Sequence, residues 1–235
     1  NGNDRLVGGA GIDTAVFSSK ANRINLGSTR RQTTGDGRDI LRGIENVNGG
    51  GGNDTINGNS SANTLNGGNG NDTLKGGTGN DRLVGGAGID TAVFSSRNNR
   101  INLGSTIRQN TGDGRDILIG IENVNGGQGS DTINGNSSAN TLNGGEDNDT
   151  LNGGLGNDRL VGAHGIDTAV FSSRNNRINL GTWRRQTTGD GRDILIGIEN
   201  VNGGGGNDTI TGNSSPNTLN GGAGNDTIYG GLHND

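Results

Sequence analysis

Residues Gly67 to Val93 read GGNGNDTLK, GGTGNDRLV and GGAGIDTAV, three nonapeptides placed end to end. Each has the form Gly-Gly-x-Gly-x-Asp-x-apolar-x. The glycines allow positive φ values and a close approach of backbone carbonyl groups to an ion, and the aspartate supplies charge. The last three residues form a strand with one inward apolar side chain, which is too short to be stable without stacked neighbours.

Two nonapeptides are predicted to make one coil of strand, turn, strand and turn. Successive coils would stack as parallel strands about 4.8 Å apart. Aspartates two nonapeptides apart, such as Asp72 and Asp90, then lie one above the other. A hard divalent cation between them would relieve their repulsion, and Ca²⁺ accepts irregular cages of carboxylate and carbonyl oxygens more readily than Mg²⁺.

This pattern resembles the RTX (repeats-in-toxin) calcium-binding nonapeptide repeat over nearly the whole chain. The resemblance implies an all-β fold, a right-handed parallel β-roll or β-solenoid of short strands that binds multiple Ca²⁺ ions. It also implies type I secretion from a bacterial cell. The predicted metal ligands are the aspartates of the turns and the glycines of the most regular ones: Asp4, Asp13, Asp39, Asp54, Gly68, Gly70, Asp72, Gly77, Gly79, Asp81, Gly86, Gly88, Asp90, Asp116, Asp131, Asp149, Asp158, Asp167, Asp193, Asp208 and Asp226.

A glycine-rich disordered linker is the competing interpretation, since the chain has 51 glycines and only 25% hydrophobic residues. The strict phasing of Asp with Leu or Ile argues against it. This interpretation stays open for the metal-free chain alone.

A longer period of 77 residues is superimposed on the short one. The hexapeptide GGAGID at Gly8–Asp13 recurs at Gly85–Asp90 and, altered, at Gly162–Asp167. We therefore divide the chain into three tandem blocks, residues 1–77, 78–154 and 155–231, with residues 232–235 starting another. We expect about four coils per block in one continuous solenoid, and a longer repetitive parent protein. The inward positions predicted for the first block are Ala15, Asn25, Leu41, Val47, Ile56, Leu65, Leu74 and Leu83.

Some repeats depart from the consensus. Asn63, Asn140 and Asn217 stand where an aspartate is expected, while Asp147 and Ala163 replace turn glycines. The two edges of the first block should therefore differ in calcium content. One edge is predicted to stack Asp39, Asp54, Asp72 and Asp90, and the poorer edge Asn63 and Asp81.

Irregular segments at residues 17–48, 94–125 and 171–202 interrupt the nonapeptides. Phe17, Phe94 and Phe171 are predicted to fill the core, and residues 27–35 to protrude as a loop. The three segments contain fifteen Lys and Arg against nine Asp and Glu, whereas the rest of the chain contains four against fifteen. Basic loops of this kind solubilise a surface or attract a polyanionic glycan, and we favour the first role.

The composition also bears on compartment. The chain has no cysteine, so no disulfide can stabilise it, and bound metal can supply the stability instead. No apolar run is long enough to span a membrane and no N-terminal signal is visible. Because calcium is far more concentrated outside cells than in the cytosol, we expect folding at an extracellular or cell-surface location.

Catalysis is not expected, because the chain has two histidines, no cysteine and evenly spread aspartates rather than a cluster of dissimilar groups. The favoured function is a calcium-rigidified structural repeat of an adhesin stalk, surface layer or extracellular filament. The alternatives are the calcium-folded secretion module of a toxin, protease or lipase and, less favoured, an ice-binding solenoid. Calcium is the one firm partner, self-association and glycan binding stay open, and the scarcity of aromatic residues argues against nucleic acid.

Overall fold

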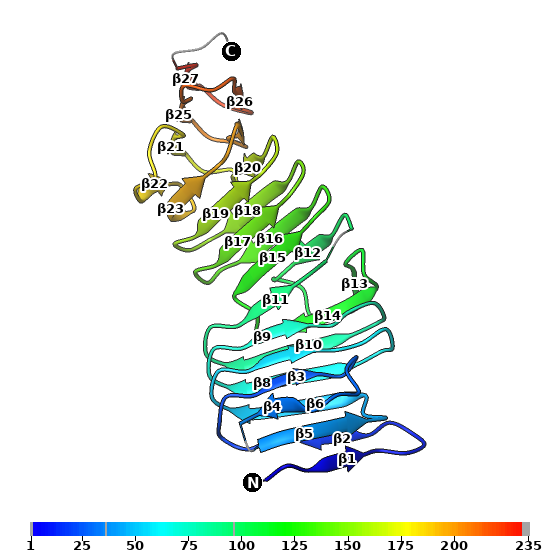
Figure 1. Cartoon of the computed structure of the whole chain (residues 1–235). Coiled ribbons are helices and arrows are strands. Elements are labelled where there is room, and N and C mark those ends of the chain that lie inside the picture. Colours follow the sequence, from blue (N-terminus) through cyan, green and yellow to red (C-terminus); the bar gives the residue numbers. More distant parts are fainter. Residues whose placement is uncertain (1, 36, 96, 232–235) are drawn as a thin grey trace. The chain divides into compact units, whose positions relative to one another are not determined.

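The computed structural model describes residues 2–35, 37–95 and 97–231, and all regular elements in that part of the chain are short β-strands. Residues 232–235, predicted to begin a further block, lie outside the described residues. Two compact units are present (Figure 1). Unit 1 comprises Asn1–Ser95 and Ser105–Val124, and unit 2 comprises Ser96–Gly104 and Asn125–Asp235. The predicted block boundaries at residues 77 and 154 stay a prediction.

Unit 1 is built from parallel ladders of strands. One ladder contains β2 (Thr14–Val16), β6 (Asn46–Gly51), β8 (Thr64–Asn69), β10 (Arg82–Ala87) and β14 (Arg115–Ile119). A second contains β3 (Arg23–Asn25), β7 (Thr55–Asn57), β9 (Thr73–Lys75) and β11 (Thr91–Val93). A third pairs β1 (Arg5–Val7) with β5 (Gly37–Arg42).

Unit 2 repeats this arrangement. Its ladders contain β12 (Arg100–Asn102), β16 (Thr132–Asn136), β18 (Thr150–Gly154), β20 (Thr168–Val170), β24 (Asn200–Asn202) and β26 (Thr218–Asn220). They also contain β15 (Asn123–Gly127), β17 (Thr141–Gly145), β19 (Arg159–Ala163) and β23 (Gly191–Ile196). The last ladder is β21 (Arg177–Asn179), β25 (Thr209–Thr211) and β27 (Thr227–Tyr229).

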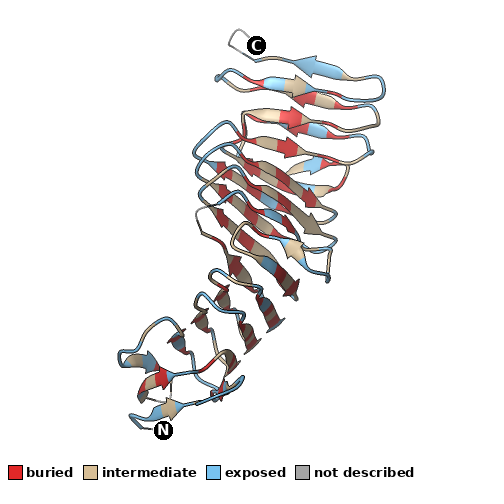
Figure 2. Ribbon diagram, turned by 90° about the vertical axis from the view of Figure 1, so that its right-hand side faces the viewer, coloured by how far each residue is buried: buried red, intermediate tan, exposed pale blue. Residues whose placement is uncertain are grey.

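The register confirms two nonapeptides per coil wherever the repeats are regular. Leu65 of β8 pairs with Leu83 of β10, and Ile56 of β7 pairs with Leu74 of β9, each 18 residues apart. These four side chains are fully buried, and each such burial contributes about 1.5–3 kcal/mol. Buried residues line the strands while the turns are exposed (Figure 2). The all-β parallel roll is thus confirmed.

One inward position differs from the prediction. The prediction that Asn25 points inward is wrong, because β3 is centred on Ile24, which is fully buried, whereas Asn25 is exposed. Side chains alternate along a strand, so an inward Ile24 requires an outward Asn25. The Asn25 side-chain oxygen instead accepts a hydrogen bond from the Gly27 amide at 2.9 Å, which ends the strand in a turn.

The irregular segments also differ from a purely parallel roll. Part of the predicted protruding loop folds back as β4 (Gln32–Thr34), which pairs antiparallel with β5. The same hairpin recurs where β13 (Gln109–Asn110) pairs with β14 and β22 (Gln186–Thr188) pairs with β23. Phe17, Phe94 and Phe171 are buried, as predicted, at 8%, 5% and 5% exposure.

Candidate calcium sites

The aspartates of successive coils stand in files joined by hydrogen bonds. In unit 1 the Asn22 amide donates to Asp54 Oδ1 at 2.7 Å, the Asp54 amide to Asp72 Oδ1 at 2.7 Å, and the Asp72 amide to Asp90 Oδ1 at 2.8 Å. The Asp90 amide then donates to Glu122 Oε2 at 2.8 Å. We call this file the Asn22 ladder. It places four carboxylates at one edge of the roll, each held by the backbone of the preceding coil.

A second file, the Asp13 ladder, lies at the other edge of unit 1. The Asp13 amide donates to Glu45 Oε2 at 2.9 Å, the Asn63 amide to Asp81 Oδ1 at 2.8 Å, and the Asp81 amide to Asp116 Oδ1 at 2.7 Å. Asn63 joins its two neighbours, because its side-chain amide also donates to the Glu45 carbonyl at 2.8 Å. An uncharged side chain therefore interrupts this edge.

Unit 2 contains equivalent files. The Asn99 ladder runs through Asp131, Asp149 and Asp167 to Glu199. The Asn140 ladder runs through Asp158 to Asp193, and the Asn176 ladder through Asp208 to Asp226. The structure thus brings the predicted aspartates together in single file rather than as clusters.

Asp39 lies elsewhere than predicted. It was expected beside Asp54, but its Oδ1 accepts from the Asp4 amide at 2.8 Å and its Oδ2 accepts from the Thr34 hydroxyl at 2.6 Å. Asn22 occupies the place next to Asp54. The chain between Ile24 and Asp39 contains the hairpin loop, and this excursion moves Asp39 to another file.

The second carboxylate oxygen, Oδ2, is the unusual atom in nine of the turn aspartates that the structure describes. Asp72 Oδ2 and Asp81 Oδ2 are buried and have no hydrogen-bond donor in the described part of the chain. A buried, unpaired polar atom is costly, so it indicates a missing partner. The same holds for the Oδ2 atoms of Asp13, Asp54, Asp90, Asp149, Asp158, Asp167 and Asp208.

Turn glycines make room for these carboxylates. A Cβ added to Gly67 would lie 2.1 Å from Asp72 Oδ2, and one added to Gly68 would lie 2.2 Å from the Gly50 carbonyl oxygen of the coil before. Gly68 also has a φ of 111°, which disfavours other residues. The turn is therefore lined by close-packed carbonyl oxygens beside an unpaired carboxylate oxygen.

The carbonyl and carboxylate oxygens of these turns are suitable ligands for a calcium ion. Among the described residues no three His, Cys, Asp or Glu side chains form a cluster that could hold a metal, so a bound ion would take most of its ligands from backbone carbonyls. Ca²⁺ accepts about six to eight oxygens of mixed carboxylate and carbonyl origin. When bound, it would supply the positive countercharge for the Oδ2 atoms.

Burial also changes the acidity of the files. Removal from water, reinforced by neighbouring carboxylates, raises the pKa of Asp72 and of Asp81 to about 6 and the pKa of Asp149 and of Asp158 to about 7, although backbone hydrogen bonds oppose the shift. Buried carboxylates without a countercharge favour the neutral form. Ionising these files at neutral pH therefore destabilises the metal-free roll.

We expect the calcium-free chain to be more stable at pH 5 than at pH 7.5. An aspartate ordinarily titrates near 3.8, so between about 4 and 7 the folded form binds more protons than the unfolded form. Stability then falls as pH rises through that window. The β content of the chelator-treated chain, followed by far-ultraviolet circular dichroism at both pH values, measures this, and equal or greater β content at pH 7.5 would contradict the buried files.

The ladders end on side chains that the sequence analysis did not single out. At the start, the Asn22 side-chain amide donates to the Lys20 carbonyl at 2.6 Å, the Gly49 carbonyl at 3.0 Å and Asp54 Oδ1 at 3.0 Å. Asn99 and Asn176 make the same three contacts one and two blocks later. A neutral NH₂ group thus faces three oxygens.

In the files that contain Asp39, Asp116 and Asp193, a threonine hydroxyl binds the last aspartate. The Thr34 hydroxyl donates to Asp39 Oδ2 at 2.6 Å, and Thr111 and Thr188 donate to the Oδ2 atoms of Asp116 and Asp193. One signal was available for the asparagine and glutamate members. Asn22 and Glu45 each precede an x-apolar-x triplet, which is the position of Asp in a nonapeptide. No comparable signal marks the threonines.

A family model matches much of this structure. The RTX calcium-binding nonapeptide repeat is matched at residues 1–15, 33–63, 42–74, 57–92, 125–160, 134–169 and 198–235. The chain belongs to this family. RTX nonapeptide repeats bind multiple Ca²⁺ ions, which agrees with the unpaired Oδ2 atoms. A comparison with curated proteins found no match.

The RTX matches leave out residues 16–32, 93–124 and 170–197. Each interval contains the asparagine that starts a ladder (Asn22, Asn99 or Asn176), which we call the asparagine cap. Two of the intervals also contain a hairpin and the threonine that binds the last aspartate of a file, which we call the threonine cap. They separate runs of RTX repeats within this chain. The described part of the chain contains no helix with the length and apolar character needed to cross a membrane.

Two turn positions of the RTX repeats keep a glycine-like backbone without glycine. Asp147 has a φ of 71° and Ala163 a φ of 82°, and they are the non-glycine residues with positive φ in the described chain. Asp147 Oδ2 accepts from the Gly129 amide at 3.1 Å. Stacking of the coils thus imposes the turn conformation even where the side chain disfavours it.

Ala163→Gly should raise the free energy of unfolding by about 1 kcal/mol, because it removes the Cβ strain of a left-handed residue. Ala87→Gly is the control, since Ala87 is exposed at the end of β10 and has no positive φ. Denaturant unfolding in saturating calcium measures both changes. An equal effect of the two substitutions would show that Ala163 is not strained.

Proposed function

We propose that this chain is a non-enzymatic, calcium-folded structural segment of a secreted or cell-surface protein. The observation that carries the proposal is the file of buried, unpaired Oδ2 atoms. The ligands would be the predicted aspartates together with the carbonyl groups of turn glycines such as Gly68, Gly70, Gly77, Gly79, Gly86 and Gly88. Each ion would neutralise carboxylates that otherwise repel one another.

The extracellular location follows from the same chemistry. A chain without disulfides, whose buried carboxylates need a cation, is stable only where calcium is abundant. The chain would stay loosely folded in the cytosol and become rigid outside. Each 77-residue block would then act as one length unit of an adhesin stalk, a surface layer or a filament, with self-association between segments as a further property.

Calcium titration of the metal-free chain, followed by far-ultraviolet circular dichroism, tests this function. We expect a coil-to-β transition near millimolar calcium, reversed by a chelator and not reproduced by Mg²⁺, which requires near-octahedral geometry. Persistent disorder in excess calcium, or a β signal that neither calcium nor a chelator changes, would argue against calcium-dependent folding.

A further inference from the structure

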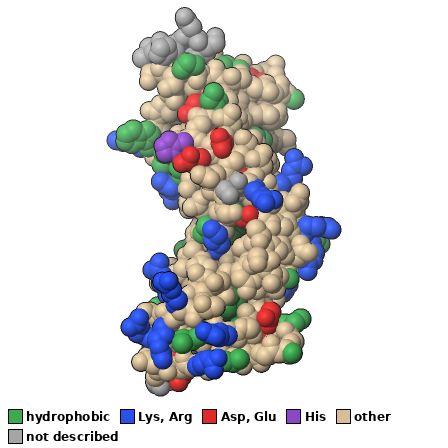
Figure 3. All heavy atoms as spheres, turned by 45° about the vertical axis from the view of Figure 1, so that its right-hand side comes forward, with side chains coloured by type: hydrophobic (Ala, Val, Ile, Leu, Met, Phe, Trp, Pro, Cys, Tyr) green, Lys and Arg blue, Asp and Glu red, His purple; other side chains and the backbone are tan. Residues whose placement is uncertain are grey.

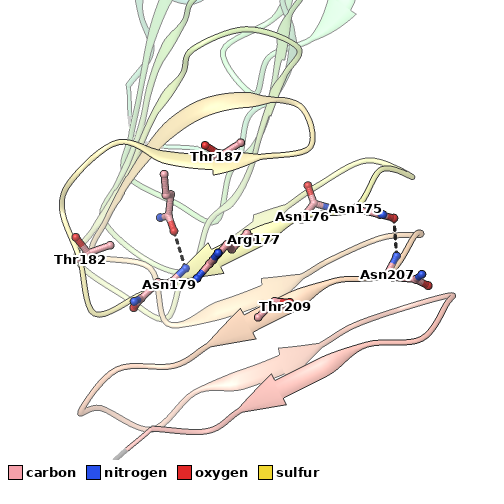
Figure 4. Close-up of a pocket in the computed structure, with 9 residues that line it drawn as sticks. Asn175, Asn176, Arg177, Asn179, Thr182, Thr187, Asn207 and Thr209 are labelled. Atoms are coloured by element: carbon pink, nitrogen blue, oxygen red, sulfur yellow. Dashed lines mark hydrogen bonds between the residues drawn. The ribbon is translucent and has the colours of Figure 1, made fainter.

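The hairpins of the irregular segments overhang the roll and enclose a groove. In unit 2 the cavity has a volume of about 690 Å³ and is lined by Arg177, Asn179, Thr182, Gln186, Thr187 and Thr209 among others (Figure 4). Its floor is the outward face of β21 and β25, and the β22 loop covers it. This volume lies within the range of about 300–1,000 Å³ typical of small-molecule sites.

The groove recurs in unit 1. There the cavity is about 350 Å³, and its lining includes Arg23, Asn25, Ser28, Gln32 and Thr33. Each of these residues stands two 77-residue intervals before a lining residue of unit 2, with Ser28 in place of Thr182. The groove thus recurs in both units at residues that are equivalent in the repeated sequence.

Hydrogen bonds hold the hairpin over the sheet before any ligand arrives. The Asn179 amide donates to Gln186 Oε1 at 2.6 Å, and the Gly181 amide donates to Asn179 Oδ1 at 2.8 Å. In unit 1 the Asn25 amide likewise donates to Gln32 Oε1. A site fixed in this way loses little conformational entropy on binding.

The charged groups of the two grooves are the guanidinium groups of Arg177 and Arg23. In the described part of the chain, the guanidinium groups of Arg177 and Arg23 make no hydrogen bond or ion pair. Gln186 Nε2 is buried and also lacks an acceptor there. The neighbouring hairpin arginine is used differently, because Arg185 donates to the Arg192 carbonyl at 3.2 Å and so ties the hairpin together.

We infer that each groove binds a carboxylated sugar unit of an acidic glycan. The guanidinium supplies paired donors for a carboxylate, and the surrounding amides and hydroxyls suit the hydroxyl groups of a sugar ring. The aspartate nearest to the groove of unit 2 in the ladders, Asp208, does not compete, since its side chain is 1% exposed. Figure 3 shows Lys and Arg side chains at many places on this face of the molecule, with Asp and Glu side chains between some of them.

In unit 2 an aromatic residue extends the floor. Tyr229 of β27 pairs with Thr211 of β25 and is 57% exposed. Strand alternation places its side chain on the same face as Asn179, because Asn179 pairs with Thr211. A ring at this position can pack against the apolar face of a second sugar.

Isothermal titration with trigalacturonate at fixed free calcium tests the inference, which rests on the calcium-folded roll of the proposed function. We expect saturable binding at millimolar concentration or below. The methyl ester of the same trisaccharide should bind about tenfold more weakly, since it keeps the hydroxyls but loses the charge-assisted contact. Equal affinity for the ester, or tighter binding of a single-stranded oligonucleotide, would overturn the assignment.

A matched pair of variants locates the site. Arg23→Ala/Arg177→Ala should lower the number of bound trisaccharides by two per chain, whereas Arg30→Ala/Arg184→Ala, which removes the same charge from the hairpin tips of the same blocks, should leave it unchanged. An equal loss in both variants would reveal non-specific surface attraction and overturn the inference. Circular dichroism of the same samples separates the two hypotheses, because a calcium-folded chain that binds no trisaccharide refutes the groove alone.

Discussion

Asn176→Ala should lower the free energy of unfolding by about 3 kcal/mol. The Asn176 side chain is 3% exposed and donates to the Arg174 carbonyl, the Gly203 carbonyl and Asp208 Oδ1, while its Oδ1 accepts from the Gly189 amide at 2.9 Å. Removal would leave these buried groups without partners, each at a cost of about 1–3 kcal/mol that water entering the site partly offsets.

Asn175→Ala provides the control for this cap. Asn175 is the adjacent residue of the same type, but it is exposed and makes one hydrogen bond, from the Asn207 amide to its Oδ1 at 2.8 Å. We expect a loss well below about 1 kcal/mol. Denaturant unfolding in saturating calcium measures both variants, and similar losses would show that Asn176 does not cap the ladder.

The effect of Asp72→Asn on the stability of the roll should be opposite without and with calcium. Without calcium the variant should be more stable than the parent chain at pH 7.5, because it removes a buried carboxyl whose pKa is raised to about 6 by loss of hydration. With calcium it should be less stable and bind about one to two fewer ions, since each carboxylate can serve ions on either side.

Asn63→Asp is the reverse substitution on the other edge. The Asn63 side-chain amide donates to the Glu45 carbonyl at 2.8 Å, and a carboxylate there would face an oxygen without a proton between them. We expect lower stability without calcium and about one additional ion with it. Calcium stoichiometry by equilibrium dialysis, combined with the β content in chelator and with denaturant unfolding in saturating calcium, measures both variants. Unchanged stoichiometry in both would remove the ladders as calcium sites.

These two experiments address different features of the ladders. The asparagine cap shows how a file of carboxylates can end without a cation, since its NH₂ group already faces three oxygens. Asn63 shows that an amide is tolerated within a file, where it joins neighbours by hydrogen bonds. In the described part of the chain, Asp54, Asp72 and Asp90 have no such donor for Oδ2, and we propose that calcium takes that place.

The sequence by itself determined the regular part of the roll. Because partners there lie 18 residues apart, the spacing of Asp and of Leu or Ile already specifies which side chains stack. The inward Leu65, Leu74 and Leu83 and the adjacent Asp54, Asp72 and Asp90 could therefore be predicted. The only physical assumption needed was that short strands must bury their apolar side chains by stacking.

The tertiary structure decided the irregular segments. Hydrogen-bonded partners there lie 32 or 35 residues apart, as in Asn22 with Asp54 and Asp81 with Asp116. These separations differ from the 18-residue period, so the period does not predict which residues pair. This is why Asp39 joins Asp4 and why the asparagine side chains that start the ladders were missed, although the triplet Arg23–Asn25 already has the x-apolar-x form that places Ile24 inward. The path of the hairpin loop determines which residues meet on either side of it. The length of the loop in the sequence does not by itself specify these contacts, because they form only when the chain folds.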